Sequence, residues 1–135
     1  MQGLLEGKVA VITGAGSGVG RAAVKLWCEH GAKVIAADID LPSAEESVKL
    51  AGAPQGQVKA IACNVADPAQ VEAAVQAAVE TFGRLDVIYN NAGVSLPDDD
   101  GPTTTPEQTW ETTLAVNVTG LWKCCRAGIP AMLDS

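Results

Sequence analysis

The segment TGAGSGVG, residues 13–20, has a glycine at every second position. The residues before it, KVAVIT at 8–13, are short, rich in β-branched types and almost wholly apolar, as in a strand buried on both faces. The residues after it have apolar side chains at helical spacing, Val19, Ala23 and Leu26, which predict a helix with this stripe toward the core. Gly31 is typical of a helix end. A strand, a glycine turn and a helix in this order predict the first crossover of a parallel α/β sheet.

The rest of the chain continues the alternation of strand and helix. Further strands are predicted at 33–38, 58–65 and 86–93. Helices are predicted to begin near Pro42, at Asp67-Pro68 and near Pro106. Right-handed crossovers then give an open parallel sheet with helices on both faces. No repeat or linker indicates a second domain, so residues 1–135 are interpreted as one domain.

Composition and charge narrow the classes of function. The 135 residues are 47% hydrophobic, which suffices for one domain with a core. The net charge of −7 comes from scattered acidic residues and disfavours a nucleic-acid or anionic-membrane surface. The N-terminus has no basic segment followed by an apolar run, and no uncharged stretch reaches the roughly 18 residues of a membrane span. We therefore expect a cytoplasmic protein without nucleic-acid or membrane partners.

The cysteines and the single histidine do not have the spacing of metal ligands. Cys28 and His30 lie two positions apart on a predicted helix and should point in different directions. No metal site is therefore predicted. Cys28 and His30 are interpreted as a packed thiol and a helix-end side chain. The vicinal Cys124 and Cys125 are interpreted as reduced structural thiols, with redox activity as the alternative.

The glycines of the turn have separate expected roles in binding a pyrophosphate. Gly14 makes the tight turn, Gly18 allows close approach of backbone to the phosphates, and Gly20 lets the helix pack near the sheet. The N–H groups at the helix start attract an anion without a lysine. The ATP-cradle pattern G-x-x-x-x-G-K-[ST] is absent, and the spacing that fits the strand end is T-G-x-x-x-G-x-G. The alternative is a glycine-rich turn without a ligand.

Asp38 ends the second predicted strand, where a carboxylate can bind both ribose hydroxyls of NAD and repel the 2′-phosphate of NADP. The next residues, Ile39, Asp40 and Leu41, supply no cation for that phosphate. We therefore predict NAD rather than NADP. A solvated loop aspartate is the alternative, which fits Asp40 better.

Taken together, TGAGSGVG, Asp38, CNVAD at 63–67, NNAG at 90–93 and Asn117 resemble the short-chain dehydrogenase/reductase family. The resemblance extends over essentially the whole chain. It implies a Rossmann-like sheet of strand order 3-2-1-4 for the part present, with NAD(P) as cofactor. It also implies hydride transfer between nicotinamide and a carbonyl or alcohol carbon.

Carried onto this sequence, the family's motifs assign cofactor binding to a set of residues in four segments. The set is Gly14, Ser17, Gly18, Val19, Gly20, Asp38, Asn64, Val65, Asn91, Ala92 and Gly93. Asn64 stands where the family usually has an aspartate that accepts from the adenine amino group, and an amide oxygen can also accept this bond. Backbone capping at a strand end is the alternative for Asn64. Asn117 resembles the asparagine of the family's catalytic tetrad.

The other three tetrad residues of the family, a serine and Tyr-x-x-x-Lys, have no match here. Tyr89 is the only tyrosine, and Gly93 stands four residues after it. The resemblance therefore implies the cofactor-binding half of an NAD-dependent oxidoreductase that does not turn over alone. The alternatives are a non-catalytic NAD-binding or interaction module and a fragment that does not fold independently. Apolar residues on the last predicted helix, among them Trp110, Leu114 and Trp122, indicate a homo-oligomer formed through that helix.

Overall fold

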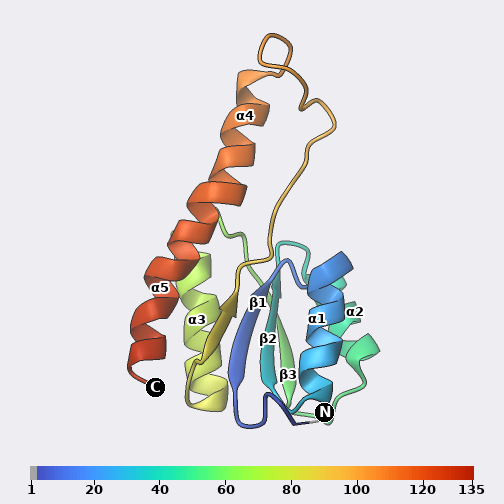
Figure 1. The fold of residues 1–135 in the computed structure, drawn as a ribbon, viewed down its shortest axis with the longest axis vertical. Helices are drawn as coiled ribbons and strands as arrows, with labels where there is room; N and C mark the ends of the chain where they lie inside the picture. The colour runs from blue at the N-terminus through green and yellow to red at the C-terminus, as the bar shows by residue number, and fades with distance from the viewer. Residues whose placement is uncertain (1–2) are drawn as a thin grey trace.

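Four parallel strands pair in the order β3-β2-β1-β4 in the computed structural model, which describes residues 3–135 (Figure 1). The strands are β1 (Val9–Thr13), β2 (Lys33–Asp38), β3 (Val58–Ala62) and β4 (Val87–Tyr89). The helices are α1 (Gly18–Glu29), α2 (Leu41–Ala51), α3 (Pro68–Phe82), α4 (Glu107–Leu114), the π-helical segment η1 (Ala115–Gly120) and α5 (Leu121–Leu133). The predicted Rossmann-like fold and its strand order are confirmed.

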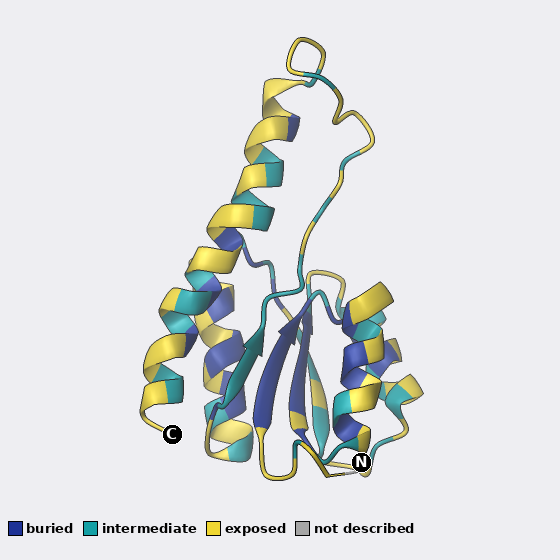
Figure 2. Cartoon of the chain, viewed as in Figure 1, coloured by how far each residue is buried: buried dark blue, intermediate teal, exposed yellow. Residues whose placement is uncertain are grey.

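The sheet has a helical layer on each face (Figure 1). The helices α1 and α2 cover one face, where Val24 and Ala44 are fully buried. The helices α3 and α5 cover the other face, where Ala78 packs against Val11 and Ile35. The two central strands β1 and β2 are almost wholly buried, as predicted for apolar parallel strands (Figure 2).

Local capping fixes where two of the helices begin. The Asp40 side chain accepts a hydrogen bond from the Ser43 N–H, and the Asp67 side chain accepts one from the Ala69 N–H. A proline follows within the first turn in both helices. The predicted helix start at Asp67-Pro68 is therefore confirmed, because an aspartate cap and an early proline both favour that position.

The third and fourth strands are shorter than predicted. The strand β3 ends at Ala62 because the next residues form a turn, in which the Asn64 carbonyl accepts from the Asp67 N–H at 2.9 Å. The strand β4 ends at Tyr89, and the N–H of Asn91 donates to the Thr13 side chain instead of to a backbone carbonyl of the neighbouring strand. Both strand ends are therefore loops at the carboxyl edge of the sheet.

The apolar stripe predicted for the first helix is only partly correct. Val19 is 65% exposed and Leu26 is 51% exposed, whereas the predicted core position Ala23 is buried. The face of α1 toward the sheet also contains Gly20 and Cys28. Small residues on this face allow α1 to lie close to the sheet, so the larger apolar residues point elsewhere.

The last three helical segments follow one another without a break from residue 107 to 133. The upper part, α4, extends beyond the sheet (Figure 1), and the lower part, α5, packs against α3 and β4. A face of small residues makes the inward contact, with Gly120, Cys124 and Gly128 buried. The opposite face is exposed (Figure 2) and includes six large apolar residues: Trp110, Leu114, Val118, Leu121, Trp122 and Ile129. The π-helical segment was not predicted.

Among residues 3–135, no helix combines the length and apolar character that crossing a bilayer requires.

Candidate functional site

The glycine turn connects the end of β1 to the start of α1 and touches the loop after β4. Gly14 has φ +64°, and a Cβ there would lie 2.9 Å from the Ala92 Cα. A Cβ at Gly20 would overlap the Gly14 carbonyl oxygen and lie 2.6 Å from the Asn91 Nδ2. Only glycine therefore allows the turn, the helix and the β4 loop to approach this closely.

The apex of the turn is open to solvent. Gly18 has φ +52°, and a Cβ there would have no neighbour within 4 Å. Ser17, Gly18 and Val19 are exposed, and Ser17 is the N-cap of α1 without a side-chain capping bond. The first turn of a helix carries N–H groups without helical partners and a partial positive charge. This helix start can therefore accept an anion such as a pyrophosphate.

The Asp38 carboxylate is fixed beside the turn at the end of β2. Its Oδ2 accepts from the Gly16 N–H at 2.8 Å, and its Oδ1 accepts from the Asp40 N–H at 2.9 Å. A Cβ at Gly16 would lie 2.8 Å from the Asp38 Oδ2, so a larger residue would displace the carboxylate. Each carboxylate oxygen can accept a further bond, which leaves capacity for sugar hydroxyls.

A threonine that sequence reasoning missed joins the glycine turn to the β4 loop. Thr13, the last residue of β1, is buried, and its Oγ1 accepts from the N–H groups of Asn91 and Ala92, both at 3.1 Å. The Asn91 Nδ2 in turn donates to the Gly14 carbonyl at 3.2 Å. Thr13 ends an otherwise apolar strand and begins the T-G-x-x-x-G-x-G pattern, but no role for its hydroxyl was predicted from the sequence.

Five of the eleven residues predicted for cofactor binding line one cavity of about 100 Å³ at this edge of the sheet, whereas Ser17, Gly18, Val19, Gly20, Asn91 and Gly93 are not part of its lining. Its lining includes Gly14 after β1, Asp38 in β2 and Ala92 after β4, and it is completed by Ile39, Cys63, Asn64, Val65, Val94 and Val116. A larger hollow of about 460 Å³ lies between α3 and α5 but contains none of the predicted site residues. The carboxyl ends of the parallel strands are also where open α/β sheets bind ligands.

Asn64 has the capping contact that was its alternative interpretation. Its Oδ1 accepts from the Ala66 N–H at 3.0 Å, and its own N–H donates to the Gln70 Oε1 at 2.8 Å. Asn64 also lines the cavity. The capping contact is therefore compatible with a ligand, since an amide oxygen has a second lone pair.

Asn117 lies in the π-helical segment η1, and its side chain binds the β4 loop. The Asn117 Oδ1 accepts from the Val94 N–H at 2.8 Å, and its Nδ2 donates to the Val94 carbonyl at 2.9 Å. A Cβ at Gly93 would lie 3.4 Å from the Asn117 Oδ1. Turns of π-helix are frequent at functional sites, which agrees with the proximity of Asn117 to this loop.

Of the remaining candidates for chemistry, Tyr89 is half-buried, and Cys63 and Cys124 are buried. The only tyrosine, Tyr89, stacks on Trp27 with ring centroids 5.4 Å apart, within the packing between α1 and the sheet. Burial raises the pKa of the Cys63 thiol to about 11, with smaller contributions from Cys124 and Asp67. Burial likewise raises the pKa of Cys124 to about 11. Both thiols are therefore protonated near neutral pH, as in packed structural cysteines.

The model of the family described as short chain dehydrogenase matches residues 8–135, and the chain belongs to this family. The D-threitol dehydrogenase of Mycolicibacterium smegmatis is 38% identical over 133 residues, which are 97% of this chain and 50% of the relative. The 3-oxoacyl-[acyl-carrier-protein] reductase of Thermotoga maritima is 37% identical over 129 residues, which are 96% of this chain and 52% of that relative. The chain thus spans about half the length of these curated relatives.

Solved structures of the same family have the same fold as this chain. The crystal structure of a protein from Burkholderia xenovorans, described as a putative short-chain dehydrogenase/reductase, aligns with a TM-score of 0.90 at 39% identity over 98% of this chain and 53% of its own. A 3-ketoacyl-(acyl-carrier-protein) reductase from Brucella melitensis, complexed with NADH, aligns with a TM-score of 0.89 at 36% identity over 96% of this chain and 52% of its own. The chain therefore has the fold of this family, and the family binds a nicotinamide cofactor.

Proposed function

We propose that this chain is the cofactor-binding half of an NAD-dependent oxidoreductase, which transfers hydride between nicotinamide and a carbonyl or alcohol carbon. One observation supports this proposal above the others: the Asp38 carboxylate is fixed 2.8 Å from the Gly16 N–H, beside the open start of α1. A dinucleotide needs a ribose-binding carboxylate beside an anion-binding helix start, because its pyrophosphate and its adenosine ribose are adjacent.

In this proposal the protein holds NAD at several points. Ser17, Gly18 and Val19 present the N–H groups of the first helical turn to the pyrophosphate. Asp38 accepts hydrogen bonds from the hydroxyls of the adenosine ribose. Asn64 and Val65 on one side of the cavity and Ala92 on the other border the adenine and the rest of the cofactor, together with Asn91 and Gly93 of the same loop as Ala92. The nicotinamide, when bound, accepts or donates the hydride.

Asp38 is also the basis for proposing NAD rather than NADP. A 2′-phosphate on the ribose would bring negative charge against the carboxylate, and like charges in a shared site repel. The neighbouring Asp40, whose side chain binds the N–H and hydroxyl of Ser43, adds a second negative charge nearby. No lysine or arginine occupies positions 39 to 42 to compensate for it.

Proton transfer is proposed to need groups outside these 135 residues. Asn117 is the proposed tetrad asparagine, and its side chain is already used to hold Val94. Tyr89, whose ring stacks on Trp27, has Gly93 rather than a lysine four residues later and is not proposed as the tetrad tyrosine. The coding sequence beyond Ser135 should therefore encode a strand, a serine and Tyr-x-x-x-Lys, and a stop codon directly after Ser135 in the gene would contradict this part of the proposal.

We also propose that the protein forms a homo-oligomer through the outer face of α4 and α5. Trp110 is 61% exposed and Trp122 is 54% exposed, and exposed apolar surface of this kind favours association. Trp122→Glu should shift the protein toward a monomer in analytical ultracentrifugation. An unchanged distribution of species would contradict the proposed interface.

Calorimetric titration of the full chain with NAD and with NADP tests the main proposal. We expect heat of binding with NAD and at least about tenfold weaker binding of NADP, a difference of about 1.4 kcal/mol or more. Asp38→Asn removes the charge but keeps one oxygen acceptor, so the preference for NAD should shrink. The absence of any heat with either nucleotide would overturn the proposal.

A further inference from the structure

Two residues that border the proposed adenosine cavity belong to the loop between β3 and α3. Asn64 and Val65 line this cavity, and Val65 is 6% exposed. The loop is shaped locally, because the Asn64 carbonyl accepts from the Asp67 N–H at 2.9 Å and the Asn64 Oδ1 accepts from the Ala66 N–H at 3.0 Å. These bonds define the form of the loop, and the bond from the Asn64 N–H to the Gln70 Oε1 at 2.8 Å joins it to α3.

The last helix fixes this loop from outside at two neighbouring points. A Cβ at Gly120 would lie only 2.7 Å from the Val65 Cγ2, so helix backbone and valine side chain are in tight contact. One turn later, the Lys123 Nζ donates to the Ala66 carbonyl at 2.7 Å, over 57 positions of sequence. Lys123 is half-buried, and a charged donor makes a stronger bond than a neutral one.

Ala66 connects Lys123 to Asn64, which lines the cavity. Its carbonyl accepts from Lys123, and its N–H donates to the Asn64 Oδ1. The ammonium group of Lys123 therefore acts on the orientation of the Asn64 amide through a single intervening residue. We propose that Lys123 is a positioning residue for dinucleotide binding, which acts through Ala66 to hold Asn64 and Val65 at the cavity wall.

This inference rests on the proposed function, since the cavity must receive the adenosine half of NAD. It does not require Lys123 to touch the cofactor. Without the ammonium group, the Ala66 carbonyl loses its partner, and Val65 and Ala66 can shift relative to the cavity while the Asn64 N–H stays bonded to Gln70. Binding then has to restore the loop geometry, and this cost lowers the affinity.

The experiment compares three lysine variants with the wild-type chain. Lys123→Met has similar length but no donor, Lys123→Arg keeps the donor, and Lys59→Met removes an exposed lysine of the adjacent strand β3 as a control. Calorimetry with NAD should show about tenfold weaker binding for Lys123→Met. Lys123→Arg and Lys59→Met should bind within about twofold of the wild type. If Lys123→Met does not fold, Lys123→Gln, which is too short to span the same distance, replaces it.

Amide hydrogen exchange of Val65, Ala66 and Asp67 gives a second readout that needs no nucleotide. Exchange should be faster in Lys123→Met and restored in Lys123→Arg. Unchanged exchange, or NAD affinity equal to that of the wild type, would overturn the positioning role. A wild-type chain that binds no NAD would instead overturn the proposed function, and the exchange data would still show whether Lys123 fixes the loop.

Discussion

Asn117 and Val94 are joined by two hydrogen bonds, one at each end of the asparagine amide, although 23 positions separate them. The bonds connect the π-helical segment η1 to the loop that follows β4. They satisfy both backbone groups of Val94 in a half-buried place where water would otherwise have to do so. The asparagine of the proposed tetrad is therefore also a structural clamp on the loop.

Replacing Asn117 by leucine should lower the free energy of unfolding by about 2 kcal/mol, because it leaves the Val94 N–H and carbonyl without partners. Urea unfolding measures the stability, and hydrogen exchange at the Val94 amide reports on the loop. Gln108→Leu is the control, since Gln108 is exposed and bonds only to Thr112 on its own helix. Equal stabilities for the two variants would show that the clamp contributes nothing.

The parts of the fold that could be predicted from the sequence depend on local physics. A glycine turn after an apolar strand and an aspartate cap before Pro68 act within a few residues, so their sequence signals are sufficient. The site contacts that were missed join distant segments instead. The Lys123 Nζ donates to the Ala66 carbonyl at 2.7 Å, and the Ser47 Oγ donates to the Ala15 carbonyl at 2.6 Å. No local sequence pattern predicts either contact.

Helix orientation was harder to predict than helix position. Val19 and Leu26 have helical spacing with the buried Ala23, yet both are exposed. The helix α1 lies so close to the sheet that small residues such as Gly20 face it. Hydrophobicity alone does not distinguish a face of small residues from an exposed face. The distance between α1 and the sheet depends on tertiary packing, which the sequence pattern of a single helix does not contain. The core-facing side of α1 was therefore predicted incorrectly at Val19 and Leu26.

Gly18 and Gly52 form a matched pair that separates backbone strain from ligand binding. Both have positive φ, +52° and +60°, and a Cβ at either position would have no neighbour within 4 Å. Alanine should therefore cost about 1 kcal/mol of stability at each position. Only Gly18→Ala should also weaken NAD binding, by about tenfold or more, because the new methyl group occupies the approach to the helix start. Urea unfolding and calorimetry measure the two effects, and wild-type affinity in Gly18→Ala would argue against pyrophosphate binding there.

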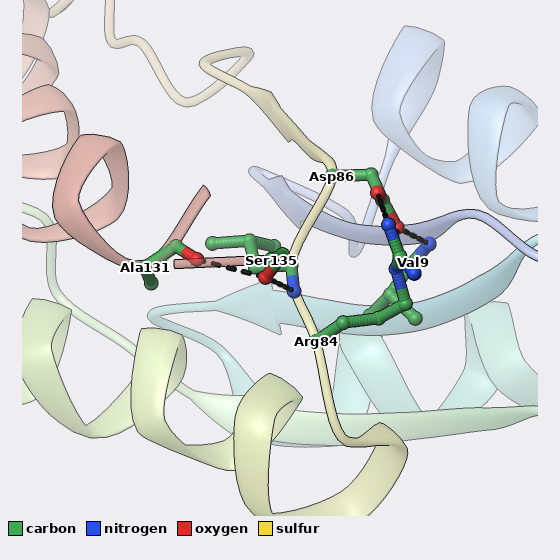
Figure 3. Close-up of polar contacts among 6 residues, drawn as sticks. Val9, Arg84, Asp86, Ala131 and Ser135 are labelled. Atoms are coloured by element: carbon green, nitrogen blue, oxygen red, sulfur yellow. Dashed lines mark hydrogen bonds and ion pairs between the residues drawn. The ribbon is translucent and has the colours of Figure 1, made fainter. Parts of the chain in front are cut away.

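Asp86, just before β4, should make stability depend on acidic pH (Figure 3). The Arg84 guanidinium donates to its two carboxylate oxygens at 2.8 and 2.6 Å, and the Val9 N–H donates to it at 2.9 Å. The hydrogen bond from Arg84 is the main cause that lowers the pKa of Asp86, while partial burial opposes it and the Val9 N–H and the charges of Arg84 and Lys8 add to it. Ser135 makes a separate contact nearby, since its Oγ accepts from the Leu85 N–H and donates to the Ala131 carbonyl (Figure 3).

Because the pKa of Asp86 is lower in the folded state than the value of about 3.9 in an unfolded chain, the ionised carboxylate stabilises the fold. This contribution is fully present above about pH 4 and is lost as the pH falls through the lowered folded value. Urea unfolding between about pH 6 and 2.5 should show the wild type more stable than Asp86→Asn at the upper end, with the difference shrinking below about pH 4. A difference that stays constant over this range would contradict the role of the charge.

Gly128 in α5 should be a position where alanine destabilises a helix. Replacing an exposed glycine in a helix interior by alanine raises the free energy of unfolding by about 1 kcal/mol. At Gly128, however, a Cβ would overlap the Ile88 Cδ1 on β4. We expect Gly128→Ala to cost about 1–3 kcal/mol through overpacking. Ile88→Val removes the overlapping methyl group, so the double variant should be more stable than the sum of the two single changes predicts. Urea unfolding of the four proteins gives the coupling energy between the two positions. Additive effects would mean that α5 moves away from the sheet freely and that the close contact does not fix its position.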